Sequence, residues 1–191
     1  MRGEEKNMKT SIYVPHRSRK KMLEAFRLAN DIHLDLLTGS RTYEIFQHLF
    51  SAKPTKEIIE VGVRRMALWY VILTLTKWTE YYDHYKLFIP DDVRNDAKKL
   101  RNDINAKGII KFRNISVGHI WDKETKMPIS IKETESRIQQ ILGPEDIDGF
   151  MRWVNDPVGN QFPRNVICVV ERVRDGIKEV NGFTENDLMF K

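Results

Sequence analysis

The chain contains few of the residues that cross-link, bend or interrupt a backbone. Among its 191 residues are one cysteine, seven prolines and ten glycines. A single cysteine cannot form an internal disulfide, and Cys168 lies in the apolar run 166–170, which indicates a buried thiol rather than a nucleophile. The sequence therefore argues against a small secreted protein held together by disulfides.

Long hydrophobic runs are also absent. The longest strongly apolar run, residues 66–76, covers about half of the roughly 20 residues that a membrane-spanning helix needs. The first ten residues are polar and charged, which is not the pattern of a secretory signal. We expect a cytoplasmic protein without a membrane-spanning segment.

Several catalytic signatures are missing as well. The sequence has no glycine-rich phosphate loop, no HExxH, no paired cysteine motif and no GxSxG. Its histidines are dispersed rather than clustered as metal ligands: His16, His33, His48, His84 and His119. We expect no metal and no other cofactor. The net charge of +5 permits a phosphate-rich partner without specifying one.

Helical periodicity is what the sequence does contain. Apolar residues recur at intervals of three and four, and glycine or proline stands between the segments. The pattern predicts helices over residues 18–37, 41–50, 54–83, 90–108, 109–121, 132–142, 145–155 and 163–180. Residues 38–40, Thr-Gly-Ser, are expected to end the first of these helices. The β-branched residues of 109–121 leave a strand open, but an isolated strand would have no partner, so we predict a helix.

The fold class that follows is all-α. We predict an up-and-down helix bundle with additional shorter helices, formed by residues 16–191 as a single domain behind a flexible N-terminus, residues 1–15. The segment 54–83 is the expected central helix, because a wide apolar face is formed by Ile58, Val61, Met66, Trp69, Ile72, Leu73 and Leu75.

One segment carries a candidate site. In residues 111–122, KFRNISVGHIWD, an arginine is followed by a polar residue, then by mainly apolar positions and a histidine. This pattern resembles the motif of HEPN domains, in which four to six residues separate an arginine from a histidine near a helix end. The spacer of Arg113 and His119, the small Gly118 and the turn that follows are most similar to the abortive-infection branch of that superfamily.

The spacing alone is weak, because three pairs in this chain satisfy it. Arg27 with His33 and Arg41 with His48 also match, but Leu28 and Thr42 follow those arginines where the family favours Asn, Asp or His. Arg113 is followed by Asn114 and lies after the expected long central helix, as in the family. The resemblance therefore selects the pair Arg113 and His119.

The resemblance implies a small helical bundle that forms dimers and acts as a metal-independent endoribonuclease of a toxin or phage-defence type. The RNA 2′-hydroxyl would attack the neighbouring phosphate. A histidine, which titrates near neutral pH, suits the proton transfer, and the permanently charged Arg113 suits the phosphorane. Asn114 would orient a phosphate oxygen or the imidazole. A cognate antitoxin is a further implied partner.

Helix geometry adds a constraint on this pair. On a regular helix, Arg113 and His119 would be about 120° apart in direction and about 9 Å apart along the axis. A second copy of the motif from a twofold mate would complete one composite site, so we expect a homodimer. Ser116 and Asp122, each three residues from His119, are candidates to hold its imidazole.

Simpler interpretations remain open. Lys107 and Lys111 belong to a basic stretch that either contacts RNA phosphates or forms an ordinary solvated face. If the motif has no function, Arg113 is a surface charge and His119 a packed imidazole. A noncatalytic RNA-binding or protein-interaction module of the same fold is the alternative function. The aromatic residues are expected to serve the core rather than to stack on bases: Trp69, Trp78, Tyr81, Tyr82 and Trp121.

Overall fold

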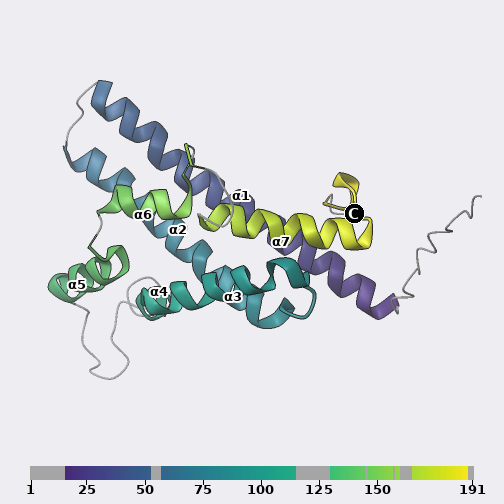
Figure 1. The fold of residues 1–191 in the computed structure, drawn as a ribbon. Coiled ribbons are helices and arrows are strands. Elements are labelled where there is room, and N and C mark those ends of the chain that lie inside the picture. Colours follow the sequence, from purple (N-terminus) through teal and green to yellow (C-terminus); the bar gives the residue numbers. More distant parts are fainter. Residues whose placement is uncertain are drawn as a thin grey trace, which may run out of the picture.

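The structure is a computed structural model that describes residues 16–52, 57–114, 130–144, 146–156, 158–159 and 165–188. All regular structure within these ranges is helical (Figure 1). The helices are α1 (His16–Ala52), α2 (Glu57–Tyr85), α3 (Asp91–Ala106), α4 (Ile109–Phe112), α5 (Ile131–Leu142), α6 (Ile147–Val154) and α7 (Val166–Asn181), followed by a short 3-10 helix, η2 (Glu185–Leu188). The all-α prediction is confirmed for these residues. The predicted flexible N-terminus, residues 1–15, lies outside them.

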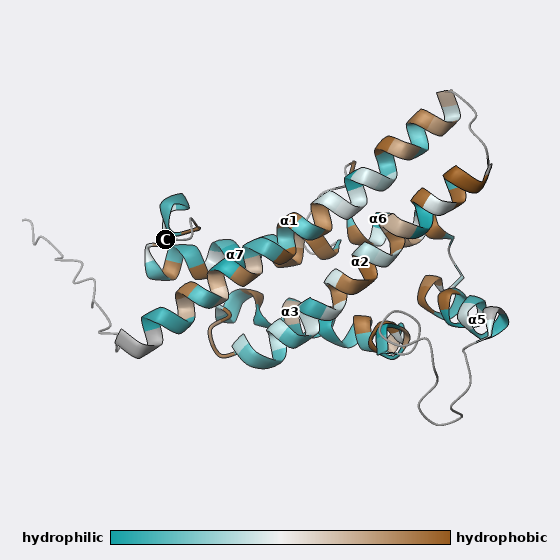
Figure 2. Cartoon of the chain, turned by 180° about the vertical axis from the view of Figure 1, so that it is seen from behind, coloured by the Kyte–Doolittle hydropathy of each residue, from teal (hydrophilic) through white to brown (hydrophobic). Residues whose placement is uncertain are grey.

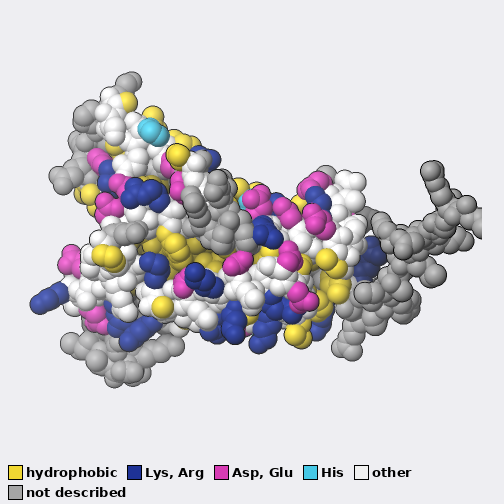
Figure 3. Space-filling view, viewed as in Figure 1, with side chains coloured by type: hydrophobic (Ala, Val, Ile, Leu, Met, Phe, Trp, Pro, Cys, Tyr) yellow, Lys and Arg dark blue, Asp and Glu magenta, His cyan; other side chains and the backbone are white. Residues whose placement is uncertain are grey.

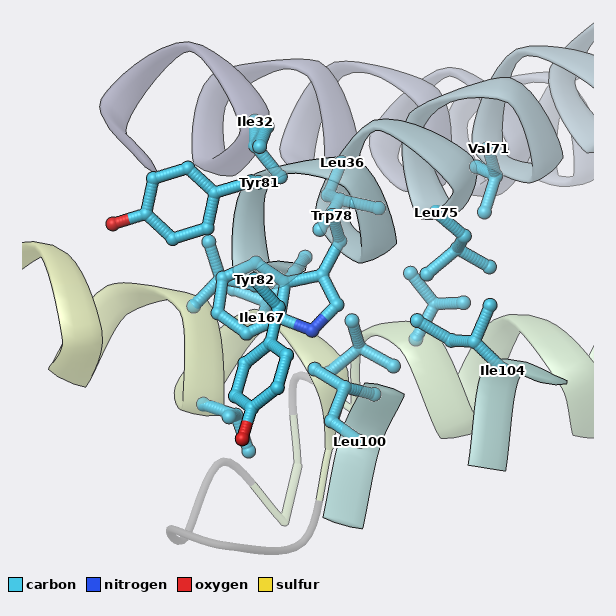
Figure 4. Close-up of a cluster of buried hydrophobic side chains, with 14 of the residues drawn as sticks. Ile32, Leu36, Val71, Leu75, Trp78, Tyr81, Tyr82, Leu100, Ile104 and Ile167 are labelled. Atoms are coloured by element: carbon cyan, nitrogen blue, oxygen red, sulfur yellow. The ribbon is translucent and has the colours of Figure 1, made fainter. Parts of the chain in front are cut away.

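Four helices form the main bundle. α1 packs along both α2 and α7, and α3 closes the arrangement against α7 and α2. The apolar side chains of all four meet in one core, in which Trp78 of α2 is fully buried between α1, α3 and α7 (Figure 4). Trp78, Tyr81 and Tyr82 thus belong to the core, as predicted, while Trp121 lies outside the described residues. Cys168 is buried too, as the sequence indicated.

The predicted break at residues 38–40 is wrong, because α1 continues through it as one helix. Gly39 lies where α1 and α2 approach each other closely. A Cβ added there would be 2.7 Å from Cγ2 of Val71 and 3.0 Å from Cδ1 of Tyr70. Ser40 is buried and its hydroxyl accepts a hydrogen bond from Asn155 at 3.1 Å. This glycine therefore allows helix packing rather than helix termination.

The apolar face predicted for α2 is only partly buried. Val71, Ile72 and Leu75 are fully buried, whereas Ile58 and Met66 are 78% and 73% exposed. Other exposed apolar residues near this end of the α1–α2 pair are Ile45, Leu49, Ile59 and Val61. Figure 2 shows the hydrophobic segments that both helices carry towards that tip. The buried part of α2 therefore begins at Ala67, about three turns into the helix.

The remaining predicted helices are present with shifted ends. Pro90 precedes α3, and α5, α6 and α7 begin at the side-chain caps Ser130, Asp146 and Asn165. η2, which the sequence did not predict, follows Phe183, whose ring stacks on Phe26 of α1 at 5.6 Å. No helix among the described residues is long and apolar enough to cross a membrane.

Candidate functional site

Arg113 and Asn114, the two residues of the candidate motif that the structure describes, lie just after α4. Gly108 has a φ of 72°, a conformation that suits glycine, and this turn redirects the chain from α3 into α4. Arg113 and Asn114 follow α4 as a wider, π-type turn. The predicted helix 109–121 is thus helical at its start, and residues 115–129 lie outside the described part of the chain.

Two buried residues hold α4 in place. Ile109 and Phe112 are fully buried, and the ring of Phe112 meets that of Trp69 edge to face at 6.1 Å. Because these two residues face the core, Lys111 and Asn114 are presented to solvent. The turn that carries Arg113 and Asn114 is therefore at the surface and is held there by the buried side chains of α4.

Arg113 is half-exposed and only loosely paired. Its Nη2 lies 3.8 Å from Oε1 of Glu80 on α2, and its Nη1 donates a hydrogen bond to Oδ1 of Asn114 at 3.2 Å. Exposed ion pairs of this kind contribute about 0 to 1 kcal/mol. An incoming phosphate can compete with Glu80 for this guanidinium at small cost.

The other motif residues cannot be placed relative to Arg113. His119, Ser116 and Asp122 lie outside the described residues. The structure thus brings Arg113 and Asn114 together, while the pairing of Arg113 with His119 stays a prediction.

Lys107 and Lys111 lie in different surroundings. The Lys107 ammonium donates a hydrogen bond to the carbonyl of Ile141 at 3.3 Å and lies 5.0 Å from the centre of the Trp153 ring. It satisfies a carbonyl in the last turn of α5 and faces an aromatic ring of α6. Lys111 is exposed. Of the two lysines, Lys111 is the one more open to a phosphate.

The first competing pair, Arg27 and His33, has visible structural roles. Arg27 donates a hydrogen bond to the carbonyl of Asp187 at 2.6 Å, which fastens η2 to α1. His33 is buried and its Nδ1 lies 2.8 Å from Nη1 of Arg174, so the imidazole accepts from the guanidinium. Burial and the charge of Arg174 both lower the pKa of His33. The hydrogen bond between His33 and Arg174 is part of the contact between α1 and α7.

Arg41 forms an ion pair with Glu44 within α1 at 2.8 Å, and His48 is exposed one turn further along. The Arg41 pair is an ordinary surface contact of one helix. Neither competing pair is accompanied by an Asn, Asp or His directly after its arginine.

Sequence reasoning missed Glu80 as the partner of Arg113. The two residues are far apart in the chain, and their contact depends on how α4 packs across α2. No local sequence signal identifies such a pair.

Comparisons with known proteins give a fold relationship only. No protein-family model and no curated protein matches this chain. A solved structure, the integron cassette protein Vpc_cass2 from the mobile metagenome of V. paracholerae, is similar with a TM-score of 0.68 and 19% identity, over 83% of this chain and 96% of that chain. At that identity the similarity concerns the arrangement of helices and not an activity.

Proposed function

We propose that this protein is a HEPN-like, metal-independent endoribonuclease of a toxin or phage-defence type, which cleaves RNA at a composite site of a homodimer. The observation that supports the proposal best is the placement of Arg113 and Asn114. They lie together on an anchored surface turn, where Arg113 forms an exposed ion pair with Glu80 and a hydrogen bond to Asn114. An arginine that binds phosphate needs a fixed backbone position and an accessible guanidinium, and Arg113 has both.

The proposed reaction is an internal phosphoryl transfer within RNA. The 2′-oxygen forms a bond to the adjacent phosphorus as its proton leaves to an imidazole, and the bond from phosphorus to the 5′-oxygen breaks as that oxygen takes up a proton. His119 moves the protons, and Arg113 offsets the added negative charge of the phosphorane. Asn114 orients a phosphate oxygen.

The supporting residues follow from the same proposal. Lys111 contacts the RNA backbone, and Lys107 would do so with an ammonium proton that the carbonyl of Ile141 does not accept. Ser116 and Asp122 hold the imidazole of His119. A second copy of the motif completes the site across a twofold axis, and a cognate antitoxin would bind where RNA enters.

The alternative is a noncatalytic HEPN-like module that binds RNA or another protein. The same exposed Arg113 would then serve recognition alone. The two functions differ in whether RNA is cut.

Incubation of the purified protein with RNA in the presence of EDTA tests the proposal. We expect cleavage that leaves cyclic phosphate ends and that falls at least about 100-fold in Arg113→Ala and in His119→Ala. Replacing the RNA with its 2′-deoxy analogue should abolish cleavage. Arg152→Ala is the matched control, because Arg152 is an exposed arginine on a different helix, α6.

Each other outcome has a definite meaning. Binding of RNA without cleavage would favour the noncatalytic module. Cleavage that survives in both Arg113→Ala and His119→Ala would refute the proposed site.

A further inference from the structure

A basic groove lies where the end of α2 meets α3. It has a volume of about 460 Å³ and is lined by Tyr82, Asp83, Lys86, Arg94, Asn95, Lys98, Arg101 and Asn102. Four of these eight residues are cations and one is an acid. Figure 3 shows the row of Lys and Arg side chains that runs along the lower edge of the molecule, over α3. We call this feature the α2–α3 groove.

The cations of the α2–α3 groove differ in how firmly they are held. Arg94 donates a hydrogen bond to the carbonyl of Ile89 at 2.8 Å and pairs with Asp91 at 2.5 Å. Lys86 and Lys98 are exposed, and neither forms an ion pair with a carboxylate that the structure describes. The two lysines are therefore the cations most available to an anion.

Arg101 connects the groove to the candidate site. Its Nη2 lies 3.3 Å from the carboxylate of Asp83 on α2. Arg113 pairs with Glu80, which stands three residues before Asp83 on the same helix. Residues at that spacing have Cβ atoms about 5 to 6 Å apart, one above the other on the helix surface. The two arginines thus approach the same turn of α2, one from α3 and one from α4.

The row of cations has a direction. Arg94, Lys98 and Arg101 lie at successive turns of α3 and span about 10 Å along its axis. This row runs towards the end of α3, after which α4 and Arg113 follow. A ligand with regularly repeated negative charges would match it.

The chemistry of the lining favours a nucleic-acid strand. Cations that track a backbone are typical of single-strand binding surfaces. Asn95 and Asn102 are exposed and add neutral donors and acceptors, which suit sugar hydroxyls and base edges. The described lining residues include no apolar patch that would insert into a lipid surface, and Leu87 is a single exposed leucine beside Lys86.

The geometry points to the α2–α3 groove as a binding site for the phosphate backbone of single-stranded RNA, which it leads towards Arg113. This inference rests on the proposed function for its substrate. It adds a binding surface formed by residues outside the motif, chiefly Lys86, Lys98 and Arg101.

A binding experiment separates this inference from catalysis. The probe is a fluorescently labelled single-stranded RNA, and its anisotropy is titrated with His119→Ala protein in EDTA, so that no cleavage interferes. In that background, the double substitution Lys86→Glu and Lys98→Glu should weaken binding about tenfold or more and reduce the dependence of binding on salt.

The control must change the net charge equally elsewhere. Lys20→Glu with Lys132→Glu does so, because both lysines are exposed and lie on α1 and α5. We expect the control to bind RNA within about threefold of the parent. Both double variants alter exposed side chains, so unchanged thermal unfolding should verify that each is folded.

The outcomes are distinct. Equal weakening by the groove and control variants, or no weakening by either, would overturn the inference, as would binding to anionic phosphatidylglycerol vesicles with none to RNA. Selective loss in the groove variant supports it, even if the wild-type protein cuts no RNA and the proposed catalysis fails. If cleavage depends on Arg113 and His119 but the groove variant binds RNA as tightly as its parent, the proposed function holds and the inference about the groove is wrong.

Discussion

The guanidinium of Arg113 and the carboxylate of Glu80 lie 3.8 Å apart and join α4 to α2 at the surface. Both side chains are substantially exposed, at 43% and 62%. Solvent weakens such a pair, yet the negative charge of Glu80 stands where a phosphate would approach Arg113. Glu80 is thus a competitor of the proposed substrate.

Removing this charge should strengthen RNA binding. In the His119→Ala background, Glu80→Gln is expected to increase the affinity for single-stranded RNA about threefold or more, because one carboxylate near the phosphate path is lost. Fluorescence anisotropy measures it, and Glu135→Gln on α5 provides a control with the same charge change at an exposed site. Weaker binding by Glu80→Gln would mean that Glu80 positions Arg113 for the ligand instead of competing with it.

The candidate site was only partly predictable from sequence. Arg113 and Asn114 could be selected because the residue after an arginine is a local feature of the chain. Their support could not, since Trp69 and Glu80 reach the motif from α2 through tertiary packing. Lys86 was missed for the same reason, because it follows α2 and joins the cations of α3 only through tertiary packing.

Gly39 offers a direct test of the packing of α1 on α2. In Gly39→Ala the new methyl group would lie 2.7 Å from Val71, a fully buried and β-branched residue that cannot easily move. We expect the free energy of unfolding to fall by about 1 to 3 kcal/mol. Gly62→Ala on α2 is the matched control, because nothing lies within 4 Å of its added Cβ, and it should stabilise by about 0.5 to 1 kcal/mol. Chemical denaturation measures both, and equal stabilisation would disprove the close-packing role of Gly39.

This glycine also shows why the fold was predictable only in part. Gly108 and Gly182 end or redirect helices with positive φ, as the sequence pattern suggests. Gly39 looks the same in sequence, yet its helix continues. A glycine fits there because Val71 and Tyr70 of α2 leave no room for a side chain. Likewise, the apolar Ile58 and Met66 look like core residues until the arrangement of the helices leaves them exposed.

Lys107 and Lys111 should respond differently to the same substitution. Lys107→Met removes the ammonium that contacts the carbonyl of Ile141 and the Trp153 ring, and we expect a loss of about 1 to 2 kcal/mol in the free energy of unfolding. Lys111→Met should change stability by less than about 0.5 kcal/mol and weaken RNA binding about threefold or more. Paired denaturation and anisotropy measurements distinguish them. A Lys107→Met protein of unchanged stability but weakened RNA binding would reverse the two assignments.

His33 should make the stability of the bundle dependent on pH. Its imidazole is buried and accepts from Arg174, with Glu171 and Asp175 also nearby, and burial and the charge of Arg174 lower its pKa in the folded protein below the ordinary value for histidine. As the pH falls through the ordinary pKa of histidine, the unfolded chain takes up a proton before the folded one does. Protonation therefore favours unfolding, and the free energy of unfolding decreases until the pH passes below the folded pKa.

We expect His33→Gln to lose less stability than the wild-type protein between pH 7.5 and pH 5.5, because a neutral amide can still accept from Arg174 and does not titrate. Urea denaturation at both pH values gives the two differences, and subtraction removes the contribution of the carboxylates common to both proteins. His48→Gln, at an exposed position of the same helix, is the control and should follow the wild-type protein. If His33→Gln and the wild-type protein lose the same stability on acidification, the imidazole does not enter the fold in its neutral form.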